Sequence, residues 1–280
     1  MANILLVANL NCDRVMQLPA TLQTGGRFYY SEKGRRLGGG GANTGIGLVW
    51  AEHNVQLVSQ VSVDSSGDWL LQKAMSYGIN CQLVARREAL SCEMMLMMTP
   101  DGERTILRPV RPPLCLPNMP CWESIDVLYV NSSADGLDNW TAAAMMDCLV
   151  VTQLAKDNRK RDAHILLTSE SDLKGRCHGS PWQFALDIAG HKLRYFIVTN
   201  GHLGATLFTA NGMIRLDAKE ANVLDTTGAG DAYAAGLIHG FLGGHGIERA
   251  MEEAAIWSAF SVGSNTSIPS VELKEYLQAK

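Results

Sequence analysis

Asp-Thr-Thr-Gly-Ala-Gly-Asp, residues 225–231, is the stretch of this 280-residue sequence that decides most about its fold. It ends a strand-like segment and opens a helix rich in alanine and glycine, expected over residues 231–242. Backbone N–H groups at such a helix start have no partner within the helix, and the positive end of the helix dipole lies behind them. The stretch therefore predicts a strand-to-helix turn that can bind an anion.

Asp231 stands at the edge of this predicted anion hole, which the backbone of Gly228, Ala229 and Gly230 would form. A phosphoryl group in transfer spreads negative charge over its oxygens, and preorganised donors stabilise that charge. A carboxylate beside the hole could accept the proton of a hydroxyl that approaches the phosphorus. Taken alone, the pattern also fits a tight turn in which glycine serves the backbone and Asp231 caps the helix.

Elsewhere in the sequence, short apolar runs typical of strands buried on both faces recur at wide spacing, with helical periodicity between them. Such alternation predicts an α/β fold with a mostly parallel sheet covered by helices. We expect strands at 4–8, 55–61, 127–130, 165–167 and 195–198, and helices at 43–52, 68–77, 140–155, 182–188, 231–242 and 247–262.

Two segments, residues 28–37 and 91–110, break this rhythm because they lack helical periodicity. The second is split by Pro100-Asp101-Gly102, which is a strong turn signal between strand-like residues. They predict a small β appendage, joined to the main sheet by the proline-rich segment 109–120. A further hairpin is predicted over 205–216, around Asn211-Gly212.

The composition excludes several classes of protein. At 46% hydrophobic and 19% charged residues the chain can bury a large core, and a net charge of −4 without a long basic block argues against nucleic acid as a partner. The longest apolar runs fall far short of the ~20 residues of a membrane span, and we expect a cytoplasmic protein. Seven cysteines without a C-x-x-C pair predict neither a disulfide framework nor a zinc site. The sequence also lacks the motifs of a Walker loop or a dinucleotide-binding turn.

The stretch 225–231, followed by Ala-Tyr-Ala-Ala-Gly at 232–236, resembles the C-terminal signature of the ribokinase/PfkB family of sugar kinases. Residues 38–43, Gly-Gly-Gly-Gly-Ala-Asn, resemble the family's Gly-Gly-x-Gly-x-Asn motif, and 11–13, Asn-Cys-Asp, fall where the family has Asn-x-Asp. The resemblance implies one ribokinase-like domain over 1–280, a three-layer sandwich with a β lid formed by about 14–37 and 91–110.

The same resemblance implies roles for individual residues. Asn11, Asp13, Gly39 and Asn43 would hold the substrate, with Asn131 as a further candidate after the strand at 127–130. Residues 198–204 resemble the Thr-x-Gly-x-x-Gly turn beside the ATP phosphates, and 263–267 fall at the adenine side. The nucleotide and monovalent-cation positions implied in this way are Thr199, Gly201, Gly204 and Asn265 for ATP, and Asp225 and Thr227 for a K⁺ site.

One departure from the family concerns magnesium. Where relatives have Asn-x-x-Glu, which organises Mg²⁺ through waters, this chain has Ser169-Glu170-Ser171-Asp172. Asp172 keeps the charge on a side chain shorter by one methylene, and Ser169 replaces an amide by a hydroxyl. We therefore expect altered magnesium coordination or nucleotide affinity.

The resulting hypothesis is an ATP-dependent kinase that phosphorylates a hydroxyl of a small sugar, with Asp231 as the base. A nucleoside kinase, or a catalytically weak sugar- or nucleotide-binding regulator of the same fold, are alternatives. Gly40 stands where a lysine is common in relatives, which favours an unphosphorylated substrate. Lid strands of this family often pair between subunits, so a homodimer through the lid is a further expectation.

Overall fold

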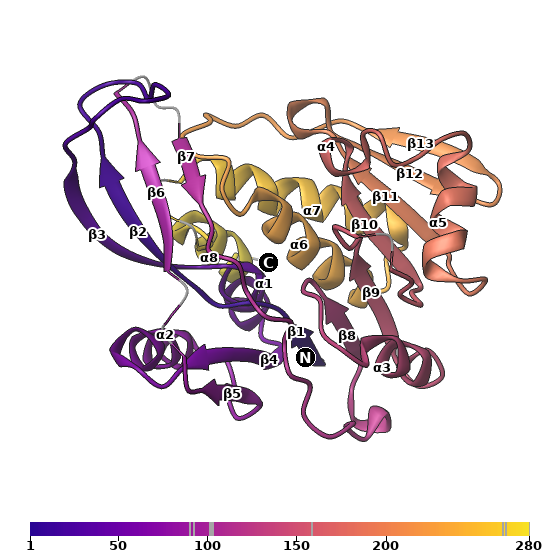
Figure 1. The fold of residues 1–280 in the computed structure, drawn as a ribbon. Coiled ribbons are helices and arrows are strands. Elements are labelled where there is room, and N and C mark those ends of the chain that lie inside the picture. Colours follow the sequence, from indigo (N-terminus) through magenta and orange to yellow (C-terminus); the bar gives the residue numbers. More distant parts are fainter. Residues whose placement is uncertain are drawn as a thin grey trace.

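The computed structural model describes residues 1–89, 91, 93–100, 104–157, 159–264, 266 and 268–279. Figure 1 shows a large sheet with helices on both faces and a smaller sheet beside it. The strands of the large sheet are β1 Asn3–Val7, β4 Asn54–Ser62, β5 Val84–Arg87, β8 Val127–Val130, β9 Leu149–Gln153, β10 Ile165–Ser169, β11 Tyr195–Thr199, β12 Ala205–Thr209 and β13 Gly212–Leu216.

Neighbouring strands of the large sheet run in the order β13-β12-β11-β10-β9-β8-β1-β4-β5. They pair in parallel from β11 to β5, whereas β11–β12 and β12–β13 pair antiparallel. The antiparallel pair β12–β13 is the hairpin predicted over 205–216. Because the carboxyl ends of parallel strands meet at one edge of a sheet, residues that follow β1, β8, β10 and β11 come together there.

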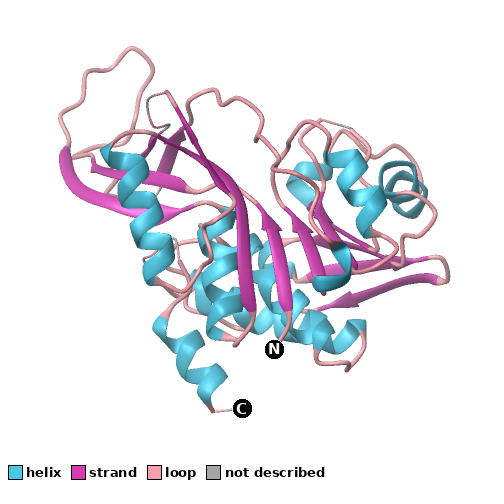
Figure 2. Cartoon of the chain, turned by 90° about the horizontal axis from the view of Figure 1, so that it is seen from below, coloured by secondary structure: helices cyan, strands magenta, loops and turns pink. Residues whose placement is uncertain are grey.

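Helices cover both faces of the large sheet, and Figure 2 shows the three layers from below. In β1, Ile4 and Leu6 join the core under α1 and α6, while Leu5 and Val7 join the core under α3 and α5, because successive strand residues point to opposite faces. In the described part of the chain, no helix is both long enough and apolar enough to cross a bilayer. The helices are α1 Gly40–Trp50, α2 Ser65–Ser76, α3 Leu137–Ala144, α4 Glu170–Leu173, α5 Pro181–Ala189, α6 Ala229–Leu242, α7 Ile247–Val262 and α8 Val271–Gln278, with short 3-10 helices η1 Trp122–Ser124 and η2 Gly201–Leu203.

The smaller sheet, called the lid here, consists of β2 Asn11–Gln17, β3 Ser31–Gly38, β6 Glu93–Met98 and β7 Arg104–Leu107 in the order β3-β2-β6-β7. Its first strand begins three residues before the predicted lid segment 14–37. The strands β6 and β7 pair antiparallel, as a hairpin around residues 100–102 requires. Asp101 and Gly102 of the predicted turn lie outside the described residues.

The predicted helix over residues 140–155 is wrong beyond residue 144. The helix α3 ends at Ala144, and residues 149–153 form β9, which pairs with β8 and β10. Val150, Val151 and Thr152 are fully buried between these neighbours. Periodicity cannot separate a short buried strand from the continuation of a helix, so the apolar run at 149–154 was assigned to the wrong element.

Candidate active site

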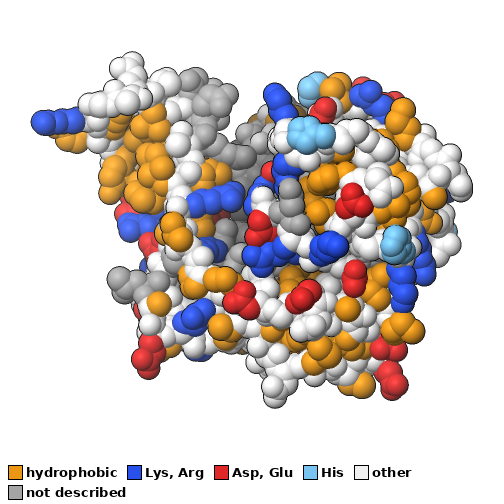
Figure 3. All heavy atoms as spheres, turned by 45° about the vertical axis from the view of Figure 1, so that its right-hand side comes forward, with side chains coloured by type: hydrophobic (Ala, Val, Ile, Leu, Met, Phe, Trp, Pro, Cys, Tyr) orange, Lys and Arg blue, Asp and Glu red, His pale blue; other side chains and the backbone are white. Residues whose placement is uncertain are grey.

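A cavity of about 610 Å³ lies between the lid and the carboxyl ends of the sheet strands. We call it the inner cavity, and Figure 3 shows the hollow between the lid and the main body from one side. Twelve residues predicted from the sequence to belong to the site line it: Asn11, Asp13, Gly39, Asn43, Asn131, Ser169, Asp172, Thr199, Thr227, Gly228, Gly230 and Asp231.

Asp231 lies in the first turn of α6, and each oxygen of its carboxylate accepts a hydrogen bond from an amide side chain. Asn131 Nδ2 donates to Oδ1 at 2.8 Å, and Asn43 Nδ2 donates to Oδ2 at 2.9 Å. Burial raises the pKa of Asp231, and the two amide hydrogen bonds oppose that rise because they stabilise the charged form. The pair of amides therefore holds a half-buried carboxylate in one orientation.

The glycine loop before α1 lets these groups approach one another. A Cβ atom at Gly40 would lie 2.5 Å from Asn131 Nδ2, so any larger residue there would displace the amide from Asp231. Gly39 has a φ of 84°, a conformation that favours glycine, and it precedes the first residue of α1. Asn43 is therefore one turn inside the helix, where its side chain reaches Asp231, and it does not cap the helix.

Asn11 and Asp13 lie on β2, where the lid joins the main body. Asp13 is only 5% exposed, and its carboxylate packs against the Cα of Gly38 so closely that a Cβ there would overlap it. Asn11 Oδ1 accepts a hydrogen bond of 2.7 Å from the Arg111 guanidinium, in the connector after the lid. The predicted substrate residues of this strand thus face the inner cavity together with an arginine that no sequence motif indicated.

The turn at the start of α6 leaves several backbone amides unused. Asp225 Oδ1 accepts from the Thr227 amide at 2.8 Å and from its hydroxyl at 2.6 Å, and the Ala229 amide lies 3.4 Å from Thr226 O. Gly228 has a left-handed φ of 79°. Within the described residues, the amides of Gly228, Gly230 and Asp231 have no acceptor, so they form an anion hole in which Ala229 takes little part.

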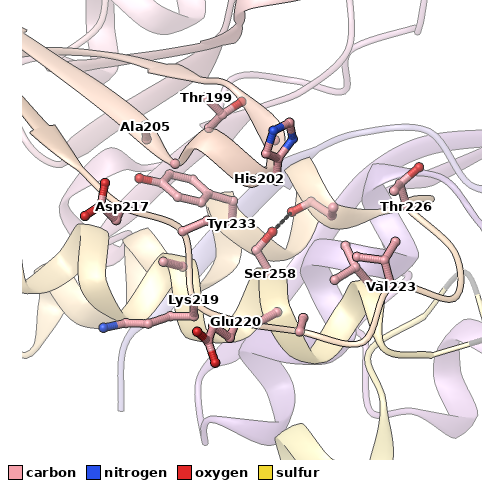
Figure 4. Close-up of a pocket in the computed structure, with 18 of the residues that line it drawn as sticks. Thr199, His202, Ala205, Asp217, Lys219, Glu220, Val223, Thr226, Tyr233 and Ser258 are labelled. Carbon is pink, nitrogen blue, oxygen red and sulfur yellow. Dashed lines mark hydrogen bonds between the residues drawn. The ribbon is translucent and has the colours of Figure 1, made fainter.

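A second hollow, of about 1050 Å³, extends along α6 and α7 beside β11–β13. We call it the outer groove, and Figure 4 shows residues that line it. It contains the turn 199–204, in which the Asn200 amide donates to Gly204 O at 2.7 Å. Three residues line both hollows, so the groove and the cavity meet at the start of α6: Thr199, Gly230 and Tyr233.

The remaining predicted positions fall in different places. Gly201, Gly204 and Ala229 line the outer groove only, whereas Asp225 lines neither hollow and instead fixes the turn before α6. Asn265 lies outside the described residues. Asp172 forms an ion pair with Lys156, and its backbone amide donates to the capping hydroxyl of Ser169 at 3.1 Å.

Sequence reasoning missed the cations of the inner cavity: Arg108, Arg111, Lys156 and Arg161. Arg161 is 2% exposed and donates to Ser132 O, Ser133 Oγ and Gln153 O. The signal that could have drawn attention to it is the basic run at 159–161, which the sequence analysis treated only as too short for nucleic acid. No motif shows which arginine of such a run is buried.

Comparison with known proteins agrees with the family resemblance found in the sequence. A family model described as pfkB family carbohydrate kinase matches residues 124–273, which is more than half of the chain. Deoxyribokinase of Salmonella typhi is 38% identical over 89 residues, which are 30% of this chain and 29% of that protein. A 5-dehydro-2-deoxygluconokinase of Bacillus subtilis is 26% identical over 107 residues, 38% of this chain and 33% of its own length.

These matches span about a third or less of the curated relatives. Among solved structures, ribokinase from Thermotoga maritima superimposes with a TM-score of 0.77 over all of both chains at 18% identity, a likeness of fold. The ribokinase-like fold and the match of the family model agree. The chain belongs to the pfkB family of carbohydrate kinases.

Proposed function

We propose that the protein transfers the γ-phosphoryl group of ATP to a hydroxyl of a small carbohydrate. The observation that carries this proposal is the position of Asp231, which lines the inner cavity in the same turn as the unpaired amides of Gly228 and Gly230, at the start of α6 where the outer groove meets the cavity. In this reading the inner cavity binds the acceptor and the outer groove binds the nucleotide. Both relatives named above carry kinase names with carbohydrate substrates, which supports the same reaction class.

Asp231 would act as the general base. The acceptor hydroxyl gives its proton to the carboxylate as its oxygen forms a bond to the γ-phosphorus, and the bond from that phosphorus to the bridging oxygen breaks to release ADP. Burial increases the affinity of the carboxylate for this proton, while Asn43 and Asn131 keep it charged and oriented before the reaction. The amides of Gly228 and Gly230 would stabilise charge on the transferred group.

Asn11 and Asp13 would hold acceptor hydroxyls, since amide and carboxylate groups present acceptors and donors that match a polyol. Both residues lie on the lid strand β2, and closure of the lid over the inner cavity would exclude water, which competes as a phosphoryl acceptor. Thr199, Gly201 and Gly204 would flank the nucleotide phosphates. Pairing of two copies through the lid stays a prediction.

The side chains present do not fit a magnesium ion held by the protein. No group of three or more His, Cys, Asp or Glu side chains within the described residues could ligate a metal, and Asp172 is occupied by Lys156. Asp225 Oδ1 accepts two hydrogen bonds from Thr227 and fixes the turn before α6, and a K⁺ ion beside these two residues stays a prediction. A divalent cation would therefore arrive with the nucleotide phosphates, as is usual for this ion.

The test is ATP consumption against a panel of sugars, sugar acids and nucleosides, with Asp231→Asn alongside. This variant keeps the shape of the side chain and should lose about 10²- to 10⁴-fold in kcat, the range for a general base. Asp68→Asn is the matched control, because Asp68 pairs with Arg86 on the surface. Full activity of Asp231→Asn would exclude the proposed base, and tight sugar binding without turnover would favour a binding protein.

A further inference from the structure

Three arginines line the inner cavity at positions that phosphoryl transfer to a neutral sugar does not require. They are Arg108, Arg111 and Arg161, and none of them lines the outer groove. Figure 3 shows Lys and Arg side chains on both walls of the hollow between the lid and the main body. This inference rests on the proposed function, because it concerns the acceptor of that reaction.

Arg161 is a buried cation that forms no ion pair within the described residues, and the Asp157 carboxylate near it pairs with Arg159. Arg161 Nη2 donates to Ser133 Oγ at 2.8 Å and to Ser132 O at 3.3 Å, and its Nη1 donates to Gln153 O at 3.0 Å. Its Nε has no acceptor, and no carboxylate of the described residues pairs with it. Burial lowers the pKa of the guanidinium to about 10, so it stays charged at neutral pH. A buried charge of this kind is unfavourable until an anion joins it.

The other two arginines approach from the lid side. Arg111 donates to Asn11 Oδ1 at 2.7 Å, which places its guanidinium beside a proposed substrate residue. Arg108 follows the last strand of the lid, is exposed, and forms no ion pair within the described residues. Positive charge therefore faces the cavity from both of its walls.

Arg161 lies on the acceptor side of the proposed reaction. It lines the inner cavity and does not line the outer groove, in which the nucleotide would bind. Its partners Ser132 and Ser133 directly follow Asn131, whose side chain contacts Asp231. Lys156, which lines the same cavity, is already paired with Asp172. An anionic group on an acceptor bound in this cavity would therefore meet a guanidinium that has no ion pair.

We propose that the acceptor is an anionic sugar, whose carboxylate or phosphate is bound by Arg161 with Arg108 and Arg111 while a hydroxyl at its other end faces Asp231. Guanidinium groups suit this task because their paired donors match the oxygens of a carboxylate or phosphate.

The test measures kcat/KM for matched pairs of acceptors with the full chain: gluconate against glucose, 2-dehydro-3-deoxygluconate against deoxyglucose, and ribose 5-phosphate against ribose. The anionic member of at least one pair should be preferred about 10- to 100-fold, the worth of one charge-assisted hydrogen bond. The first two pairs report a sugar acid and the third a sugar phosphate. Better turnover of every neutral member would overturn the proposal. If none consumes ATP, the proposed function fails, and calorimetry of the same pairs still decides the anion site.

Variants separate anion binding from general damage. Arg108→Gln should raise KM for the anionic acceptor about 10-fold or more and change KM for its neutral partner much less. Arg111→Gln should also raise KM more for the anionic acceptor than for the neutral one, although it removes the hydrogen bond to Asn11 and can therefore affect both. Arg161→Lys keeps the charge but loses the paired donors of the guanidinium, so it too should raise KM more for the anionic acceptor than for the neutral one. Because the residue is buried, the fold of this variant is checked by circular dichroism. Arg86→Gln, at a surface ion pair with Asp68, is the control that should change neither KM. Equal losses for anionic and neutral acceptors would contradict an anion site.

Discussion

Replacing Asn131 by leucine is expected to make the protein lose activity at a higher pH than the unsubstituted chain does. Asn131 and Asn43 each donate one hydrogen bond to the Asp231 carboxylate, at 2.8 and 2.9 Å. Burial raises the pKa of Asp231, and these bonds lower it. Once the Asn131 bond is gone, burial is less opposed, and the carboxylate takes up its proton at a higher pH.

The size of the effect follows from the kind of bond removed. A hydrogen bond to a charged group contributes about 1.5 to 3 kcal/mol, so the charged fraction of Asp231 at acidic pH should fall about 10- to 100-fold. Since only the charged form accepts a proton from the acceptor hydroxyl, kcat/KM should fall by the same factor on the acid side. At alkaline pH the carboxylate is charged in both proteins, and most of the difference should disappear.

The assay is kcat/KM between about pH 5 and pH 9, with ADP release detected and the best acceptor of the panel as substrate. Asn9→Leu is the matched control, because Asn9 lines the same cavity and donates to Ser132 Oγ at 2.8 Å without touching Asp231. Its acid limb should coincide with that of the unsubstituted protein. A loss for Asn131→Leu that is equal at every pH would refute the reasoning, since Asn131 would then act on acceptor binding alone.

Three further outcomes follow from buried groups. Burial lowers the pKa of His53 and of His164 to about 4, so the unfolded chain binds the proton first as the pH falls below about 6.5. The free energy of unfolding in urea should therefore decrease between pH 7 and pH 5 by about 1 to 2 kcal/mol per histidine after allowance for solvent screening, and His164→Asn should remove its share of that dependence. Tyr233→Phe should stabilise the ligand-free protein by about 1 kcal/mol, because the Tyr233 hydroxyl is buried without a partner in the described part of the chain; a lower melting temperature would speak against this. Gly40→Ala should cost about 1 to 3 kcal/mol through overpacking against Asn131 and move the acid limb in the same direction as Asn131→Leu, which one pH series can check.

The sheet was predictable because its central strands are short apolar runs, and those at 127–130 and 195–198 lie where the sequence placed them, within one residue. The strand β9 was not predictable, because its buried residues continue the apolar pattern of α3 without a glycine or proline between them. At the site, motif residues such as Asp231 and Asn43 could be named in advance. The hydrogen bond between them could not be predicted, since it joins positions 188 residues apart and depends on how two helix starts pack. The basic run at 159–161 does not show that Arg161 is the buried member, and no motif indicated the Lys156–Asp172 pair, because burial and ion pairing are properties of the folded chain.

The motifs that seem independent in the sequence form one hydrogen-bonded cluster in the structure, and this changes what the glycine loop does. A general base inside a protein meets two opposed demands: burial makes it a stronger base, but burial also favours the neutral form that cannot act. Here the two amides of Asn43 and Asn131 settle the conflict, and the second reaches Asp231 only because residue 40 has no side chain. The loop at 38–41 therefore contributes to proton transfer through the space it leaves empty, in addition to any contact it makes with substrate. A substitution there should be visible in the pH dependence of the reaction before it is visible in the affinity for the acceptor.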